Sequence, residues 1–215
     1  MKRLRLGVLA SGRGTNLQAI INATGDGRLR AEVAVVVVDQ AGAQARERAK
    51  GAGIPEFFVD LGAYPDKRAF EGEIAAILDR HGVELVCLAG YMRILTPVML
   101  DAYRNRIINI HPSLLPAFPG LHAQRQAWEY GVRYTGCTVH FVEEEVDAGP
   151  IILQAVVPVL PDDTVGSLSA RILEQEHRIY VEAIGLYQAG LLEIEGRRVF
   201  VKSQESRIQI SGRRI

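Results

Sequence analysis

The sequence predicts an α/β protein of three layers, in which a twisted, mostly parallel sheet of about seven strands lies between two layers of helices. Apolar runs rich in β-branched residues alternate with segments of helical spacing along the first half of the chain, as in βαβ units. The run 33–38 lacks the in-and-out polarity of a half-exposed strand, so helices should cover both faces of the sheet. A length of 215 residues suits one hydrophobic core and therefore one domain.

The predicted elements follow from composition and spacing. Strands are expected at residues 4–10, 33–38, 56–59, 85–89, 107–110, 138–142 and 151–159. Helices are expected at residues 16–23, 43–50, 68–80, 97–103, 122–130 and 164–189. Gly190 is placed to stop the last helix, and a hairpin is expected over residues 192–201. We expect a single domain over residues 1–200 and a basic C-terminal tail over residues 201–215.

The composition limits the kinds of binding partner that we expect for this protein. Lys plus Arg equals Asp plus Glu at 25 each, so no basic face is expected for nucleic acid, and small ligands remain open. No apolar run reaches the length of a membrane span, so no membrane partner is expected. The two cysteines, Cys87 and Cys137, form no CxxC pair, which argues against a disulfide framework or a thiolate metal site. With no cleavage pattern behind the first residues, we expect a cytoplasmic protein without a bound metal.

A glycine-rich stretch follows the first predicted strand and opens the first helix. It runs from Ser11 to Asn16, and its backbone N–H groups together with the helix N-terminus would form a site where a phosphate binds readily. It matches neither the dinucleotide-binding nor the Walker glycine pattern. The alternative is a purely structural turn, in which the glycines serve chain reversal.

Two polar residues interrupt the apolar strand at residues 107–110. Asn109 and His111 are two positions apart, so their side chains should point to one side while Ile108 and Ile110 pack on the other. A buried Asn or His costs about 1–3 kcal/mol unless it is hydrogen-bonded, which implies a partner or a substrate. Pro112 holds His111 in extended geometry. The alternative, a satisfied core histidine, is disfavoured by the neighbouring Asn109 and by a nearby carboxylate candidate.

That carboxylate is Asp147, in a loop between two predicted strands whose small residues allow the backbone to approach a ligand closely. We expect Asp147 to lie against His111, where its charge would raise the pKa of the histidine. Ser11, Tyr91 and His111 each fall at the carboxyl end of a predicted strand, the edge at which open α/β sheets bind ligands. The sequence thus predicts a reactive pocket at this edge.

Five stretches together resemble the formyltransferase family. They are SGRGTNL at 11–17, LAGYMRIL at 88–95, NIHPSLLP at 109–116, FPG at 118–120 and DAGPII at 147–152. The match covers almost the whole chain and is most similar to the branch that acts on a phosphoribosylglycinamide in purine synthesis. The resemblance implies a three-layer Rossmann-like formyltransferase fold. It also implies formyl transfer from 10-formyltetrahydrofolate to the glycinamide amine, with small-molecule substrates and a possible homodimer.

Roles for individual residues are implied by the same resemblance. His111 would be the general acid or electrostatic stabiliser, Asn109 the oxyanion partner, and Asp147 the group that raises the histidine pKa and relays protons through water. Gly14, Thr15 and Asn16 would hold the ribosyl phosphate.

The remaining implied residues contact the substrates. Glu176 would contact the substrate amine, although an exposed face of the last helix is the alternative for this residue. The residues implied for folate binding are Arg68, Met92, Arg93, Ile94, Leu95, Glu143, Glu144, Glu145 and Val146.

Three other functions compete with this interpretation. A formyltetrahydrofolate deformylase would use a similar Asn, His and Asp but would give the formyl group to water, and it would not need the phosphate loop. A methionyl-tRNA formyltransferase would need a basic C-terminal domain that this chain is too short to hold. A non-enzymatic module for a phosphorylated ligand would explain Gly12 to Asn16 but not the polar residues at the strand end.

Overall fold

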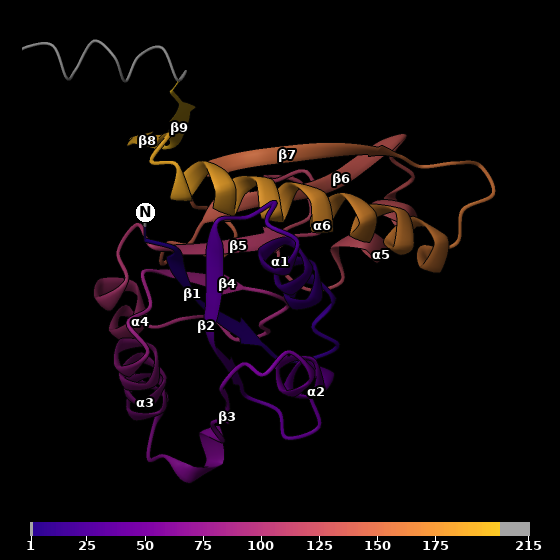
Figure 1. Cartoon of the computed structure of the whole chain (residues 1–215). Coiled ribbons are helices and arrows are strands. Elements are labelled where there is room, and N and C mark those ends of the chain that lie inside the picture. Colours follow the sequence, from indigo (N-terminus) through magenta and orange to yellow (C-terminus); the bar gives the residue numbers. More distant parts are fainter. Residues whose placement is uncertain (1, 203–215) are drawn as a thin grey trace, which may run out of the picture.

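The computed structural model describes residues 2–202, in which one sheet carries helices on both faces (Figure 1). The strands are β1 (Leu4–Ala10), β2 (Ala31–Val38), β3 (Glu56–Phe58), β4 (Leu85–Leu88), β5 (Ile107–His111), β6 (Tyr134–Phe141), β7 (Ile151–Pro158), β8 (Leu192–Glu195) and β9 (Arg198–Val201). The helices are α1 (Thr15–Gly25), α2 (Gln44–Gly51), α3 (Lys67–Arg80), α4 (Pro97–Ala102), α5 (Ala123–Tyr130) and α6 (Val165–Gln188), with a 3-10 turn at Leu61–Ala63.

The sheet is parallel in its first half and mixed in its second. Its strand order is β3-β2-β1-β4-β5-β6-β7-β9-β8, with β1 to β5 parallel and β6 antiparallel to both β5 and β7. All seven predicted strands are present. The sheet has nine strands because the closing hairpin joins it through a pairing of Ile151 with Arg198. Local sequence predicted that hairpin but could not show which edge it would pair with.

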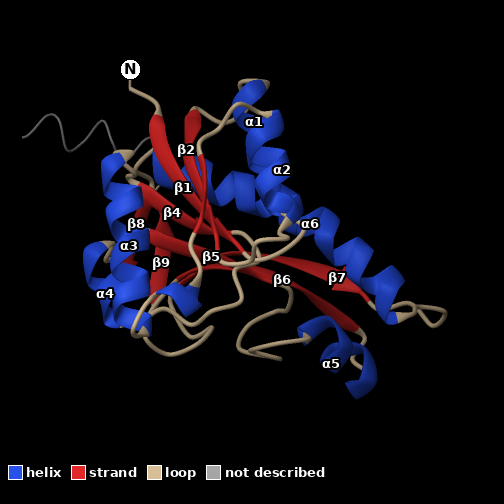
Figure 2. Ribbon diagram, turned by 90° about the horizontal axis from the view of Figure 1, so that it is seen from below, coloured by secondary structure: helices blue, strands red, loops and turns tan. Residues whose placement is uncertain are grey.

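Helices cover both faces of the sheet, which confirms the three-layer prediction. Figure 2 shows α1, α2 and α6 on one side and α3 and α4 on the other. Each layer buries its own apolar stripe, with Leu17 and Ile20 of α1 in one core and Phe70 and Ile74 of α3 in the other. Strand β2 is buried along nearly its whole length, as its unbroken valine run requires.

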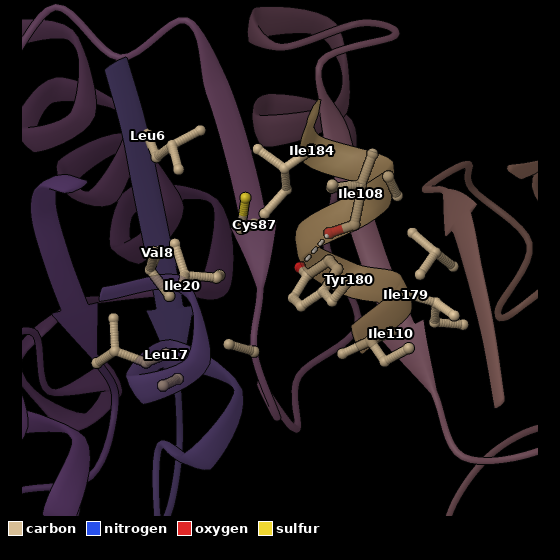
Figure 3. Packing of buried hydrophobic residues seen from close by; sticks show 14 of the residues in the cluster. Leu6, Val8, Leu17, Ile20, Cys87, Ile108, Ile110, Ile179, Tyr180 and Ile184 are labelled. Carbon is tan, nitrogen blue, oxygen red and sulfur yellow. Dashed lines mark hydrogen bonds between the residues drawn. The ribbon is translucent and has the colours of Figure 1, made fainter. Parts of the chain in front are cut away.

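Helix α6 is tied to the middle of the sheet through Tyr180. Its buried hydroxyl donates to the carbonyl oxygen of Leu88, at 2.9 Å, and to that of Ile108, at 3.2 Å. Figure 3 shows the bond to Ile108. One bond therefore reaches the end of β4 and the other reaches β5. Glu176 lies one helical turn before Tyr180 on the same face, which directs it toward the ligand-binding edge of the sheet.

Two expectations concern parts of the chain beyond this core. The predicted basic tail falls almost entirely on residues 203–215, which lie outside the described residues. Within residues 2–202, no helix combines the length and the apolar character needed to cross a membrane.

Candidate active site

Strand β5 places Asn109 and His111 as the alternation predicted. Ile108 and Ile110 pack into the core beneath α6, and the two polar side chains lie on the opposite face. His111 is only 4% exposed and Asn109 is half-buried. The strand therefore presents two hydrogen-bonding side chains in a place where water is largely excluded.

The loop between β6 and β7 brings Asp147 to this face. Asp147 Oδ2 lies 3.3 Å from His111 Nδ1 and accepts a 2.7 Å hydrogen bond from the backbone N–H of Gly120. Asp147 itself has a left-handed backbone with φ of 55°. Gly149 allows the loop to fold back this closely, since a Cβ there would lie 1.9 Å from the Phe141 carbonyl oxygen.

A second histidine, His140, completes the group. Its Nε2 lies 3.2 Å from Asn109 Nδ2 and 3.6 Å from Asp147 Oδ1, and its Nδ1 donates to the Phe141 carbonyl at 2.8 Å. We call Asn109, His111, His140 and Asp147 the His111 cluster. Sequence reasoning missed His140, although it interrupts a predicted strand and stands opposite Asn109 in the antiparallel register of β5 and β6.

Burial and charge compete in setting the pKa values of this cluster. Burial lowers the pKa of His111 below its ordinary value, although the Phe118 carbonyl and the Asp147 charge both raise it and His140 lowers it further. The expectation that Asp147 would raise this pKa was thus right for that one charge but wrong for the net direction, because sequence does not show desolvation. For Asp147, burial raises the pKa, but contacts with His140, Gly120 and His111 outweigh it and leave the pKa lowered.

The other ring nitrogen of His111 faces the loop that follows β5. Nε2 donates a 2.9 Å hydrogen bond to the carbonyl oxygen of Phe118, which also accepts from Ser113 Oγ at 3.3 Å. Phe118 has φ of 53°, so the loop turns sharply to bring this carbonyl over the imidazole. A substrate oxygen that takes the Nε2 hydrogen bond would replace the Phe118 carbonyl.

The glycine-rich loop forms the N-terminus of α1. Gly14 is left-handed with φ of 67°, and no side chain caps the helix, so the first backbone N–H groups have no side-chain acceptor. A Cβ on Gly14 would lie 2.8 Å from both Cα and Cβ of Ala45, which explains the glycine on steric as well as conformational grounds. Backbone amides without a side-chain cap at a helix N-terminus are groups that an anion can bind.

Glu176 meets this loop through Asn16. Asn16 Nδ2 donates to Glu176 Oε2 at 2.8 Å, and both residues are buried, at 7% exposure each. The alternative of an exposed helix face for Glu176 is therefore wrong. Burial raises the pKa of Glu176, and the Asn16 hydrogen bond and the Arg13 charge oppose that effect only in part. Asn16 Oδ1 is buried without a partner, which leaves one acceptor available for a ligand.

A cavity of about 500 Å³ lies between α4 and the loop after β6. The predicted folate residues Glu143, Glu144 and Glu145 line it together with Leu100 and Val142, which sequence reasoning missed. Its other lining residues are Pro97, Asp101, Arg104 and Asn105. The cavity thus combines apolar walls with carboxylates, and Val146 lies exposed just beyond it.

The loop after β4 presents some of its predicted folate residues and buries others. Met92 and Ile94 are 63% and 57% exposed, whereas Leu95 is buried. Arg93 turns inward, where its Nε contacts Asp39 Oδ2 at 2.5 Å and its guanidinium lies over the Phe70 ring. The side chain of Arg93 therefore anchors this loop and is not presented to a ligand.

The first turn of α3 adjoins this loop. The Lys67 side chain donates to the Ile94 carbonyl, and Arg68 beside it is exposed. Within residues 2–202, no three His, Cys, Asp or Glu side chains are grouped so as to hold a metal ion, and the absence of a metal stays a prediction.

Comparison with known proteins identifies the family. The model of the formyl transferase family matches residues 4–184. The phosphoribosylglycinamide formyltransferase of Escherichia coli is 42% identical over 197 residues, which are 92% of this chain and 93% of that protein. The chain also matches trifunctional purine biosynthetic proteins of animals, but it spans a fifth or less of their length, such as 19% of the chicken protein.

Solved structures agree in fold. Glycinamide ribonucleotide transformylase 1 from Symbiobacterium toebii superposes with a TM-score of 0.92 and 58% identity, over 94% of this chain and 95% of that chain. A formyltetrahydrofolate deformylase from Pseudomonas syringae has a TM-score of 0.87 but 28% identity, and the match covers 94% of this chain and 67% of that one. From its sequence, fold and site, the chain belongs to the formyl transferase family.

Proposed function

We propose that the chain transfers the formyl group of 10-formyltetrahydrofolate to the amine of N1-(5-phospho-D-ribosyl)glycinamide, releasing tetrahydrofolate, as a step of de novo purine (IMP) biosynthesis. The observation that carries this proposal is the convergence of Asn109, His111 and Asp147 in one buried cluster. Strands β1, β4 and β5 are parallel neighbours, so the phosphate loop, the loop after β4 and His111 share one edge of the sheet.

The cluster suits acyl transfer to an amine. As the amine nitrogen bonds to the formyl carbon, the carbonyl oxygen gains negative charge and needs hydrogen-bond donors. Asn109 Nδ2 and His111 Nε2 are the donors that we assign to it. The bond between the formyl carbon and N10 of the folate then breaks, and the proton lost by the amine moves to N10. We assign this relay to Asp147 and water, with Asp147 also stabilising the His111 imidazolium.

The phosphoribosyl substrate would lie between α1 and α6. The backbone N–H groups of Gly14, Thr15 and Asn16 would bind its phosphate, since no side chain caps them. The unpartnered Asn16 Oδ1 would accept a hydrogen bond from the same substrate. Glu176 would hold the amine end, because a cationic ammonium offsets the cost of ionising a buried carboxyl.

The folate would occupy the cavity beside α4. Leu100 and Val142 supply apolar contact for a flat ring, and the carboxylates Glu143 to Glu145 can accept from its amino groups. The exposed Met92 and Ile94 would extend this contact along the molecule. Arg68 is the cation that we assign to the carboxylate tail of the folate.

The first prediction distinguishes transfer from hydrolysis. Purified protein should release tetrahydrofolate from 10-formyltetrahydrofolate only when the glycinamide ribonucleotide is present, because the amine is the acceptor. Absorbance follows tetrahydrofolate release, and mass spectrometry identifies the formylated product. Release at the same rate without the ribonucleotide would identify a deformylase, and no release under either condition would contradict formyl transfer.

A second prediction concerns Glu176→Gln, which keeps the Asn16 hydrogen bond but removes the charge. The pKa of the Glu176 carboxyl is raised in the folded protein. The folded state therefore loses stability as pH rises from the pKa of this carboxyl in the unfolded chain to its pKa in the folded protein. The variant should therefore gain about 2–4 °C in Tm over the wild type at pH 8, and less at acidic pH. Its KM for the ribonucleotide should rise about tenfold, because the ionic partner of the amine is lost.

Thermal unfolding at two pH values and steady-state kinetics check both parts. Asp162→Asn, on an exposed loop, is the control for loss of one negative charge. A lower Tm at pH 8 together with an unchanged KM would contradict the assignment of Glu176 to the substrate amine.

The chain's surroundings follow from less direct observations. We infer a cytoplasmic protein, since Cys87 and Cys137 are both free and buried, as in a reducing compartment. The balanced charge supports small-molecule partners and neither nucleic acid nor membrane. A homodimer stays a prediction, and sedimentation at several protein concentrations tests it.

A further inference from the structure

Helix α2 contacts the carbonyl groups of the glycine-rich loop at residues 11–16, which we call the phosphate loop. The backbone N–H of Ala45 donates to the carbonyl of Gly12 at 3.1 Å, and Arg48 Nε donates to the carbonyl of Arg13 at 2.7 Å. Two successive carbonyls of the loop are therefore bound by the same helix. No residue of α2 takes part in the mechanism proposed above.

These two bonds determine where the loop's N–H groups point. In a trans peptide the C=O and N–H bonds lie in one plane and point in opposite directions. Binding the carbonyls of Gly12 and Arg13 on the α2 side therefore turns the N–H groups of Arg13 and Gly14 away from α2. Successive N–H groups that point to one side form the kind of concavity that binds an anion.

The packing leaves the loop little room to move toward α2. Gly14 lies so close to Ala45 that a Cβ on the glycine would be 2.8 Å from Ala45 Cα and 3.3 Å from Arg48 Cδ. Arg48 Nη1 also donates to Gln18 Oε1, at 3.2 Å, one turn into α1. One guanidinium thus joins the loop, the following helix and α2.

The charge of Arg48 has no carboxylate partner within residues 2–202. The neighbouring Arg46 differs, since its Nε and Nη2 bind the two carboxylate oxygens of Glu56 at 2.8 and 3.0 Å. Arg48 instead lines a cavity of about 490 Å³ between α1, α2 and α6, together with Thr15, Gln18 and His177. Its unpaired positive charge therefore makes the electrostatic potential at the phosphate loop more positive.

We propose that Arg48 is a positioning residue for the phosphate of the substrate. It acts through the loop, by holding the Arg13 carbonyl so that the N–H groups of the loop face the phosphate, and it touches no reacting atom. This inference rests on the proposed function for the identity of the substrate. The positioning role of Arg48 itself requires only that the loop bind a phosphorylated ribose.

The test compares Arg48→Ala with Arg46→Ala, which removes an arginine from the same helix without touching the loop. With 10-formyltetrahydrofolate saturating, Arg48→Ala should raise KM for the ribonucleotide about ten- to hundredfold and leave kcat within about threefold, as expected for loss of a charge-assisted hydrogen bond used in binding. The KM for the folate should not change. Arg46→Ala should keep the wild-type KM for both substrates.

Arg48→Lys separates geometry from charge. Lysine keeps the charge but lacks the planar fork that presents Nε to Arg13 and Nη1 to Gln18, so it should recover only part of the lost affinity. Full recovery by lysine would overturn the positioning role in favour of charge alone. An unchanged KM in Arg48→Ala, or an equal rise in Arg46→Ala, would overturn the proposal as a whole.

Calorimetric titration with ribose 5-phosphate keeps the two proposals apart. Wild-type protein and Arg46→Ala should bind it, and Arg48→Ala should bind about tenfold or more weakly. If this pattern appears but the protein transfers no formyl group, the positioning role of Arg48 is supported and the proposed function is wrong. If the wild type does not bind ribose 5-phosphate, the loop is not a phosphate site and the positioning role of Arg48 is overturned.

Discussion

Replacement of His111 by alanine should lower kcat about 10³- to 10⁴-fold and leave both KM values nearly unchanged. The imidazole is buried beside Asp147 and its Nε2 is the donor that we assign to the developing oxyanion. That interaction becomes strong only as charge develops on the oxygen, so its loss falls on kcat and not on binding. Steady-state kinetics with each substrate varied in turn measures the split.

A matched control uses a histidine outside the site. His81→Gln changes a residue at the end of α3, where the ring Nδ1 contacts the Ile77 carbonyl, and it should keep full activity. Thermal unfolding of both variants shows whether the fold survives. A kcat loss below about tenfold in a folded His111→Ala protein would remove His111 from the chemical step.

Asp147→Asn should lower kcat about 10²- to 10⁴-fold and change the acidic side of its pH profile. The pKa of Asp147 is lowered, so the wild-type carboxylate stays ionised to a lower pH than an ordinary aspartate does. Asparagine does not titrate, and that acidic limb should disappear or move. Loss of the charge also removes one of the effects that raise the His111 pKa, so the imidazolium becomes scarcer at neutral pH.

The same carboxylate contributes to stability with a definite sign. Because its folded pKa is lowered, its contribution is present above the unfolded pKa and is lost as pH falls through the folded pKa. The variant should therefore be less stable than the wild type at neutral pH, with the difference shrinking in acid. Glu129→Gln, an exposed carboxyl on α5, is the control and should alter neither kcat nor the profile. An unchanged kcat–pH profile in Asp147→Asn would remove Asp147 from the mechanism.

Sequence patterns predicted the framework because they report local geometry. The unbroken valine run indicated a strand covered on both faces, and alternation in β5 put Asn109 and His111 on one side. That the sheet has nine strands was not predictable, because the pairing of β9 with β7 depends on contacts distant in sequence. The small residues of its loop brought Asp147 to notice, but the 3.3 Å contact with His111 required the fold.

The misses have physical causes of the same kind. His140 enters the site only through the antiparallel register that sets it opposite Asn109. Arg93 stays a predicted folate residue, but its side chain points inward to the buried Asp39, a contact that the sequence does not show. The net pKa direction of His111 depends on how completely the ring is buried, and no pattern of charges along the chain reports that.

The shared hydroxyl of Tyr180 has a consequence for the pairing of two substrates. Glu176 and Tyr180 are four residues apart on α6, a rise of about 6 Å, and Tyr180 is bonded to the backbone just before Asn109. The residue assigned to the incoming amine and the donor assigned to the formyl oxygen are thus parts of one rigid frame. The protein groups that hold the nucleophile and the electrophile are therefore ordered once, when the chain folds, so that only the substrates lose freedom at each turnover.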